Sequence, residues 1–134
     1  MSKDQLAALL RYRMQQANET LHEAEILFNQ SAYRGTINRA YYAIFYSVVA
    51  LLATKKLGTS KHSGVIGLFD REFVKTGLFP RELSRSLRLA FDRRQTHDYG
   101  EVSQIDEPTA QEALNDAKMF ISTVESYLHS AGYL

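Results

Sequence analysis

The 134 residues are 45% hydrophobic and 23% charged, which is enough for one core and fits one domain over residues 1–134. The absence of cysteine excludes disulfides, thiolate metal sites and thiol nucleophiles. The net charge of +1 argues neither for nor against nucleic acid, so any basic surface must be local. With no long apolar run and no apolar signal core after Met1, we expect a soluble, cytoplasmic protein without membrane contact.

The first half of the chain has helical apolar spacing throughout. A first helix is expected over 2–29, with Ser2 and Gln5 in a capping-box pattern at its start. A second helix is expected over 32–57, closed by Gly58 at the position after its last turn. Because this second helix is apolar on more than one face, we expect it at the centre of a bundle.

The second half continues the helical pattern in shorter pieces. A shorter, less regular helix is expected within 59–77, and a fourth helix over about 80–97. Residues 100–105 should form a loop, and the last helix should begin at Asp106 as N-cap and fade near Gly132. Four long helices with short joints predict an all-α fold, an up-down antiparallel four-helix bundle with an additional short helix.

The segment from Arg81 to Glu101 is the richest in functional groups, with five arginines, one histidine and one tyrosine. On a helix, Arg81, Arg85 and Arg88 fall on one face. Arginine clusters can hold phosphates, but arginines opposite a buried leucine stripe are equally typical of a solvated face.

A metal-free cleavage of RNA can be built from the end of this segment. His97 would handle a proton of the attacking 2′-hydroxyl or of the leaving oxygen. Arg93 or Arg94 would stabilise the charge that develops on the phosphate oxygens. The alternative is that Arg94 and Asp98, four residues apart, form a plain surface ion pair. No Asp, Glu and His cluster has metal-ligand spacing, so we expect neither a metal nor a cofactor.

Two further groups have a structural and a functional interpretation. Arg39 and Tyr42 lie off the apolar stripe of the second helix, and either pack or form a polar patch facing a ligand. If Arg39 is buried it needs a partner, for which Asp98 or Glu101 is available. His62, near a helix start, either binds phosphate or has a structural role.

Three segments resemble the small stand-alone prokaryotic members of the HEPN superfamily. They are 38–52, 61–77 and 91–101, the last followed by the helix over 106–128. The resemblance implies a helical bundle that forms a homodimer. It also implies frequent pairing with a nucleotidyltransferase-type partner protein, in toxin–antitoxin or related defence modules. Active members are similar to metal-independent endoribonucleases, whose signature is an arginine followed, after roughly four to six residues, by a histidine.

This sequence departs from that signature, because only three residues separate Arg93 from His97. The branch that it resembles places Asp-Tyr after the arginine, matched here by Arg94, Asp98 and Tyr99. Asp98 would then orient an arginine or the imidazole, and Tyr99 would stack on a base or bind phosphate.

The candidate catalytic residues are therefore Arg93, Arg94, His97 and Asp98, and the candidate binding residues are Arg39, Tyr42, His62, Arg88 and Tyr99. Three functions remain open at this point. The first is a dimeric, metal-independent endoribonuclease acting as a toxin. The second is a non-catalytic module that binds a nucleotide or a nucleotidyltransferase. The third is a structural dimer subunit whose polar cluster only organises the interface.

Overall fold

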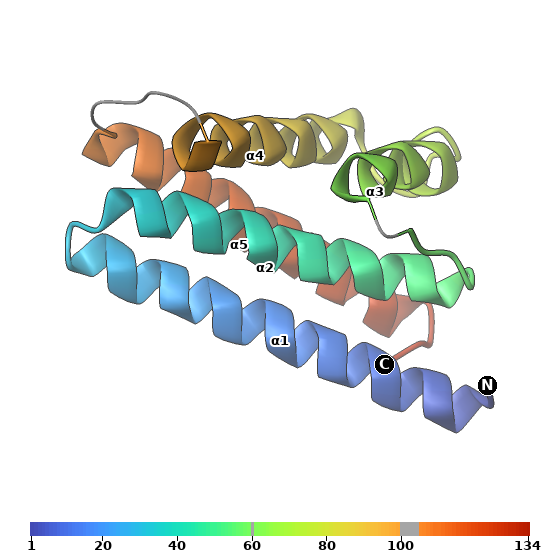
Figure 1. Cartoon of the computed structure of the whole chain (residues 1–134). Helices are drawn as coiled ribbons and strands as arrows, with labels where there is room; N and C mark the ends of the chain where they lie inside the picture. Colours follow the sequence, from blue (N-terminus) through green and yellow to red (C-terminus); the bar gives the residue numbers. More distant parts are fainter. Residues whose placement is uncertain (60, 100–104) are drawn as a thin grey trace.

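The computed structural model describes residues 1–59, 61–99 and 105–134, with the backbone alone at 97–99. Its four long helices are α1 (Lys3–Asn29), α2 (Tyr33–Thr54), α4 (Arg81–Tyr99) and α5 (Glu107–Ser130). A shorter arm, α3 (His62–Phe69) continued by the π-helical segment η1 (Asp70–Val74), connects α2 to α4. Successive long helices run in opposite directions (Figure 1), so the predicted up-down bundle with an additional short helix is confirmed.

Helix α2 lies at the centre of the bundle, as its apolar surface predicts. It contacts α1, α3, α4 and α5. By length and a mean hydropathy of 1.2, α2 is also apolar enough to cross a membrane. However, 61% of its most apolar stretch is buried against the rest of the bundle, as in the core helix of many helical proteins.

The helix starts follow the predicted capping patterns. The backbone N–H of Ser2 donates to Gln5 Oε1 at 2.8 Å, and the Gln5 N–H donates back to Ser2 Oγ at 3.1 Å. At the start of α5, the Thr109 N–H donates to Asp106 Oδ1 at 3.0 Å. Both caps satisfy backbone donors that the first helical turn leaves without a carbonyl partner, so the starts of α1 and α5 are specified locally.

The end of α2 differs from the prediction. The helix ends at Thr54, and Lys56 rather than Gly58 takes the left-handed conformation, with a φ of 57°. The Leu57 N–H then donates to the Leu52 carbonyl at 2.9 Å, which closes a Schellman motif. Leu57 packs against the core. This apolar contact fixes the position of the turn, although a lysine is a poor residue for that conformation.

The irregular third helix is confirmed, and the irregularity is the π-helical turn η1. There the Lys75 N–H donates to the Asp70 carbonyl at 2.8 Å, a step of five residues. The buried Phe69 and Phe73 rings of this arm lie 6.0 Å apart, and Phe69 lies 5.6 Å from Phe120 of α5. This aromatic cluster fixes the arm against the bundle. The fourth and fifth helices follow the expected ranges, whereas the loop predicted over 100–105 lies, except for its last residue, outside the described residues.

Candidate functional site

A buried arginine on α4 is the centre of the candidate site. Arg94 is only 7% exposed, and its Nη1 donates to the Tyr42 hydroxyl at 2.9 Å. The same nitrogen lies 3.4 Å from Nδ1 of His62. The guanidinium carbon is 5.0 Å from the centre of the Tyr41 ring and 5.5 Å from that of Tyr42. We call Arg94, His62, Tyr41 and Tyr42 the Arg94 centre; it joins α2, the start of α3 and α4.

His62 is the first residue of α3, and aromatic rings hold its imidazole in place. The ring stacks on Phe45 at 4.4 Å between centroids, and Nδ1 lies 2.7 Å from the Tyr41 hydroxyl. An arginine can only donate hydrogen bonds, so the contact with Arg94 requires Nδ1 to accept. The neutral imidazole then carries its proton on Nε2, and the Tyr41 hydroxyl donates to Nδ1.

Burial and charge keep the groups of the centre in these protonation states. Burial, reinforced by the positive charge of Arg94, lowers the pKa of His62 from its ordinary value of 6.5. Burial also raises the pKa of the Tyr41 hydroxyl, so this hydroxyl keeps its proton at neutral pH. Arg94 is always charged. The four residues of the Arg94 centre therefore hold one fixed positive charge, on Arg94, beside the neutral imidazole of His62.

Arg39 of α2 lies beside the same centre. Its guanidinium carbon is 5.1 Å from the centre of the Tyr42 ring, and its Nη2 donates to Asn38 Oδ1 at 2.8 Å. It also forms an ion pair of 3.8 Å with Glu23 of α1. The sequence offered Asp98 or Glu101 as partners, but the Asp98 side chain and Glu101 lie outside the described residues.

The structure separates the other two predicted arginines from this centre. The Arg93 side chain, 10% exposed, turns to α5 and forms ion pairs with Glu112 at 2.9 Å and Asp116 at 3.4 Å. Arg88 pairs with Asp70 of η1 in a cleft further towards the start of α4. Of the predicted residues, Arg94, Tyr42, His62 and Arg39 come together, while Arg93 and Arg88 contact other elements.

The remaining predicted residues follow on the last turn of α4. The helix continues to Tyr99, so the backbone places His97 one turn after Arg93 and Arg94. The side chains of His97, Asp98 and Tyr99 lie outside the described residues, and their predicted roles stay predictions.

Tyr41 is not among the candidate residues that the sequence indicates. Tyr41 is 1% exposed, yet its hydroxyl reaches His62. The available signal was the residue type, because a buried tyrosine usually has a partner for its hydroxyl. His62 was considered, but no pattern in the chain showed that it would meet Arg94, which is 32 residues away.

Comparisons with known proteins identify the family. The HEPN domain family model matches residues 10–127. The chain is 38% identical to a UPF0332 protein of Thermotoga maritima over 120 residues, 90% of this chain and 91% of that protein. It is 35% identical to "Putative toxin MJ0142" of Methanocaldococcus jannaschii, over 93% of this chain and 89% of that protein. It is 39% identical to "Putative toxin MJ0605" of the same organism, over 84% of this chain and 83% of that protein. Since these matches span nearly the whole chain, it belongs to the HEPN domain family.

Proposed function

We propose that this protein is a metal-independent endoribonuclease that acts as a toxin and binds the scissile phosphate at the Arg94 centre. The observation that carries the proposal is the fixed guanidinium of Arg94, held against His62 and two tyrosine rings. A charged group that is already in place stabilises developing phosphate charge without a cost of reorganisation. The names of the two Methanocaldococcus relatives support the toxin role.

The proposed reaction needs groups on this chain and water. The 2′-hydroxyl oxygen attacks the adjacent phosphorus and gives its proton to His97. The bond from phosphorus to the 5′-oxygen breaks, that oxygen takes a proton from a water molecule, and the hydroxide left behind takes up the proton held by His97. The products are a 2′,3′-cyclic phosphate and a 5′-hydroxyl. Arg94 and the Nε2–H of His62 would donate to the non-bridging phosphate oxygens as their negative charge grows.

We propose in addition that the protein acts as a homodimer, as the likeness to the family implies. Two copies that meet through the ends of their α4 helices would bring two Arg94 centres into one cleft. Size-exclusion chromatography with light scattering tests this assembly directly, and a monomer at micromolar concentration would contradict it.

A second candidate function is a binding module for a nucleotide or for a nucleotidyltransferase partner, without catalysis. The observation that favours it is that the side chains of the Arg94 centre are arranged to donate hydrogen bonds to a phosphate, and none of the four is arranged to take up a proton. Because Nδ1 of His62 accepts from Tyr41 and Arg94, Nε2 carries the proton, and the imidazole is arranged to donate rather than to take up a proton. A phosphate held in this way would be bound tightly but not necessarily cleaved.

The deciding experiment is an RNA-cleavage assay in EDTA with folded, purified protein. It compares wild type with Arg94→Lys, which keeps the charge but loses the planar guanidinium, and with His97→Ala. We expect Arg94→Lys to cleave about 10²–10³-fold more slowly. Arg11→Lys, on the exposed side of α1, is the matched control and should cleave like wild type.

The outcomes separate the two candidates. Loss of cleavage in both Arg94→Lys and His97→Ala supports the nuclease with its Arg–His pair. If wild type cleaves no RNA but nucleotides raise its melting temperature, the binding module is favoured and the nuclease is refuted. Cleavage by Arg94→Lys at the wild-type rate would refute the assignment of Arg94.

A further inference from the structure

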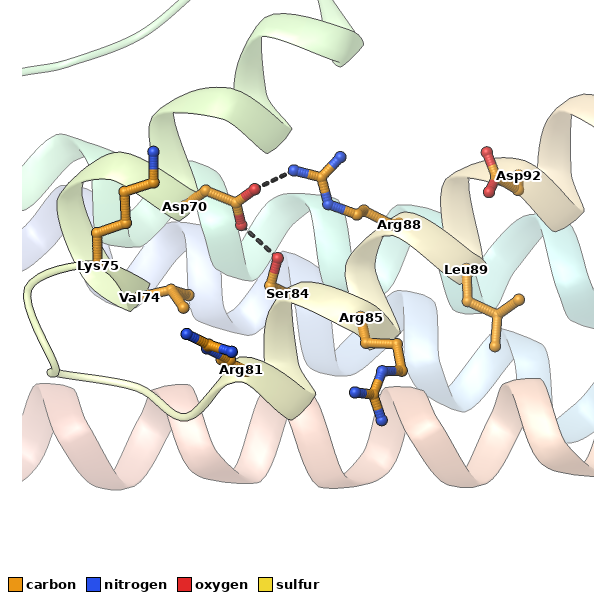
Figure 2. Close-up of a pocket in the computed structure, with 9 residues that line it drawn as sticks. All are labelled: Asp70, Val74, Lys75, Arg81, Ser84, Arg85, Arg88, Leu89 and Asp92. Carbon is orange, nitrogen blue, oxygen red and sulfur yellow. Dashed lines mark hydrogen bonds and ion pairs between the residues drawn. The ribbon is translucent and has the colours of Figure 1, made fainter.

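A recess lies on the same helix but away from the Arg94 centre. A cleft of about 720 Å³ opens between η1 and the first half of α4 (Figure 2). Its cationic residues are Lys75, Arg81, Arg85 and Arg88, and its carboxylates are Asp70 and Asp92. Four cations against two carboxylates leave a net charge of +2 in this cleft. The whole chain carries only +1, so positive charge is concentrated here.

The arginines of this cleft differ in whether they form an ion pair with a carboxylate of the protein. Asp70 accepts hydrogen bonds from both Arg88 and Ser84, which ties η1 to α4 and forms the wall of the cleft (Figure 2). Arg81 and Arg85 are exposed, and neither forms an ion pair with another residue of the described chain. Successive members of the row Arg81, Arg85 and Arg88 are about one helical turn apart. Two of these three guanidinium groups are therefore available to an outside anion.

The cleft leads towards the Arg94 centre. An adjoining pocket of about 360 Å³ shares Arg88 and Asp92 with it, so the two recesses are neighbours. This second pocket is also lined by Ser63, next to His62, and by Phe91. The Phe91 ring lies 6.1 Å from the ring of Tyr41 in the Arg94 centre. Phe91 therefore contacts the Arg94 centre and also lines the pocket that adjoins the cleft of the arginine row.

We propose that this groove binds the sugar–phosphate backbone of a single RNA strand, several nucleotides away from the phosphate at the Arg94 centre. The inference rests on the proposed function for the identity of the ligand. Arg81 and Arg85 would contact phosphates in succession, as guanidinium groups on one helix face can. The exposed Leu89, 37% accessible, offers an apolar surface for a base within the same cleft.

The carboxylate of Asp92 limits where the phosphates can lie. A carboxylate repels a phosphate, so the phosphates belong over Arg81 and Arg85 rather than over the junction of the two pockets. Asp92 can instead accept a hydrogen bond from a ribose 2′-hydroxyl or a base amino group. This mixture of charges favours an RNA strand, which carries hydroxyl and amino donors, over a polyanion that carries negative charge alone.

The test measures binding and not cleavage. Fluorescence anisotropy in EDTA would follow labelled 2′-O-methyl RNA, which cannot react, as a strand of about 15 nucleotides and as a dinucleotide. The test variant is the double substitution Arg81→Gln with Arg85→Gln. The matched control is Lys3→Gln with Arg11→Gln, which removes two charges from α1, a helix without contact to α4 or η1 in the described chain.

We expect the test variant to bind the long strand on the order of tenfold more weakly at low salt than the control does. The slope of log affinity against log salt should fall by about 1.4, since each single-strand phosphate contact contributes roughly 0.7. The dinucleotide, too short to span both recesses, should lose less affinity than the long strand. Equal affinities of test and control variants for the long strand would overturn the proposal, as would a wild type that binds no RNA.

These results are distinguishable from failure of the proposed function. A wild type that binds the long strand through Arg81 and Arg85 but never cleaves RNA would refute the nuclease and leave the groove standing. A wild type that cleaves RNA, with test and control variants binding alike, would refute the groove and leave the nuclease standing.

Discussion

The neighbouring arginines Arg93 and Arg94 provide the sharpest test of how α4 is oriented. In the structure Arg93 connects α4 to α5 through ion pairs with Glu112 and Asp116. Arg94 instead contacts Tyr42 and His62. We therefore expect Arg93→Gln to destabilise the fold but, once the protein is folded, to leave RNA cleavage near the wild-type rate. Arg94→Lys should do the opposite and reduce cleavage more than stability.

The magnitude for Arg93 follows from the exposure of its partners. The Glu112 side chain is 62% exposed, so solvent screens that pair and it contributes less than about 1 kcal/mol. The Asp116 side chain is 31% exposed and faces an Arg93 side chain that is 10% exposed, so this pair should contribute about 1 kcal/mol. Together the loss should be about 1–2 kcal/mol. With an unfolding entropy of about 2.1 cal/mol/K per residue, the melting temperature should fall by roughly 4–7 °C.

Calorimetry on Arg93→Gln, Asp116→Asn and the double variant would measure this contribution. The double-mutant cycle should show a coupling free energy of about 0.5–1 kcal/mol. A coupling near zero, or an unchanged melting temperature in Arg93→Gln, would mean that the observed ion pairs do not hold α4. Loss of cleavage in a fully folded Arg93→Gln variant would move the catalytic assignment from Arg94 to Arg93.

Two further predictions concern local features. Lys56→Gly should raise stability by roughly 0.5–1 kcal/mol, because glycine adopts the φ of 57° at this position without strain; Lys56→Ala should bring no gain in a thermal melt. His62 should titrate below 6.5 in a histidine NMR titration and carry its proton on Nε2, and a pKa above 6.5 would contradict the proposed arrangement with Arg94. Because the unfolded chain then takes up this proton at higher pH than the folded protein, the stability due to His62 is present above pH 6.5. That contribution is lost as the pH falls through the lowered pKa.

The fold was largely predictable because its signals are local. The capping residues Ser2 and Asp106 mark helix starts through contacts within one turn, and the apolar stripes recur at helical spacing. The end of α2 was not predictable in this way. Lys56 occupies a glycine-like position because Leu57 packs into the core, and this is a tertiary contact that overrides local preference.

The site was predictable only as a set of residue types. Arg93 and Arg94 point about 100° apart on an α-helix, and nothing in the segment itself shows which direction faces which neighbour. The carboxylates of Glu112 and Asp116 on α5 decide the environment of Arg93, and α2 and α3 decide that of Arg94. Residues from distant segments thus give two adjacent arginines different environments.

The length of α4 sets how long an RNA strand must be in order to bind both proposed sites. Arg94 lies nine positions after Arg85, so their backbone positions lie about 14 Å apart along the helix and their side chains leave α4 on opposite sides. Both ends of this distance are fixed, because Asp70 ties the first half of α4 to η1 and Arg93 ties the second half to α5. A dinucleotide cannot bridge that distance, whereas a longer strand can occupy both recesses at once. The dependence of affinity on RNA length, more than affinity itself, is therefore the property that would show one strand reaching both the arginine row and the Arg94 centre.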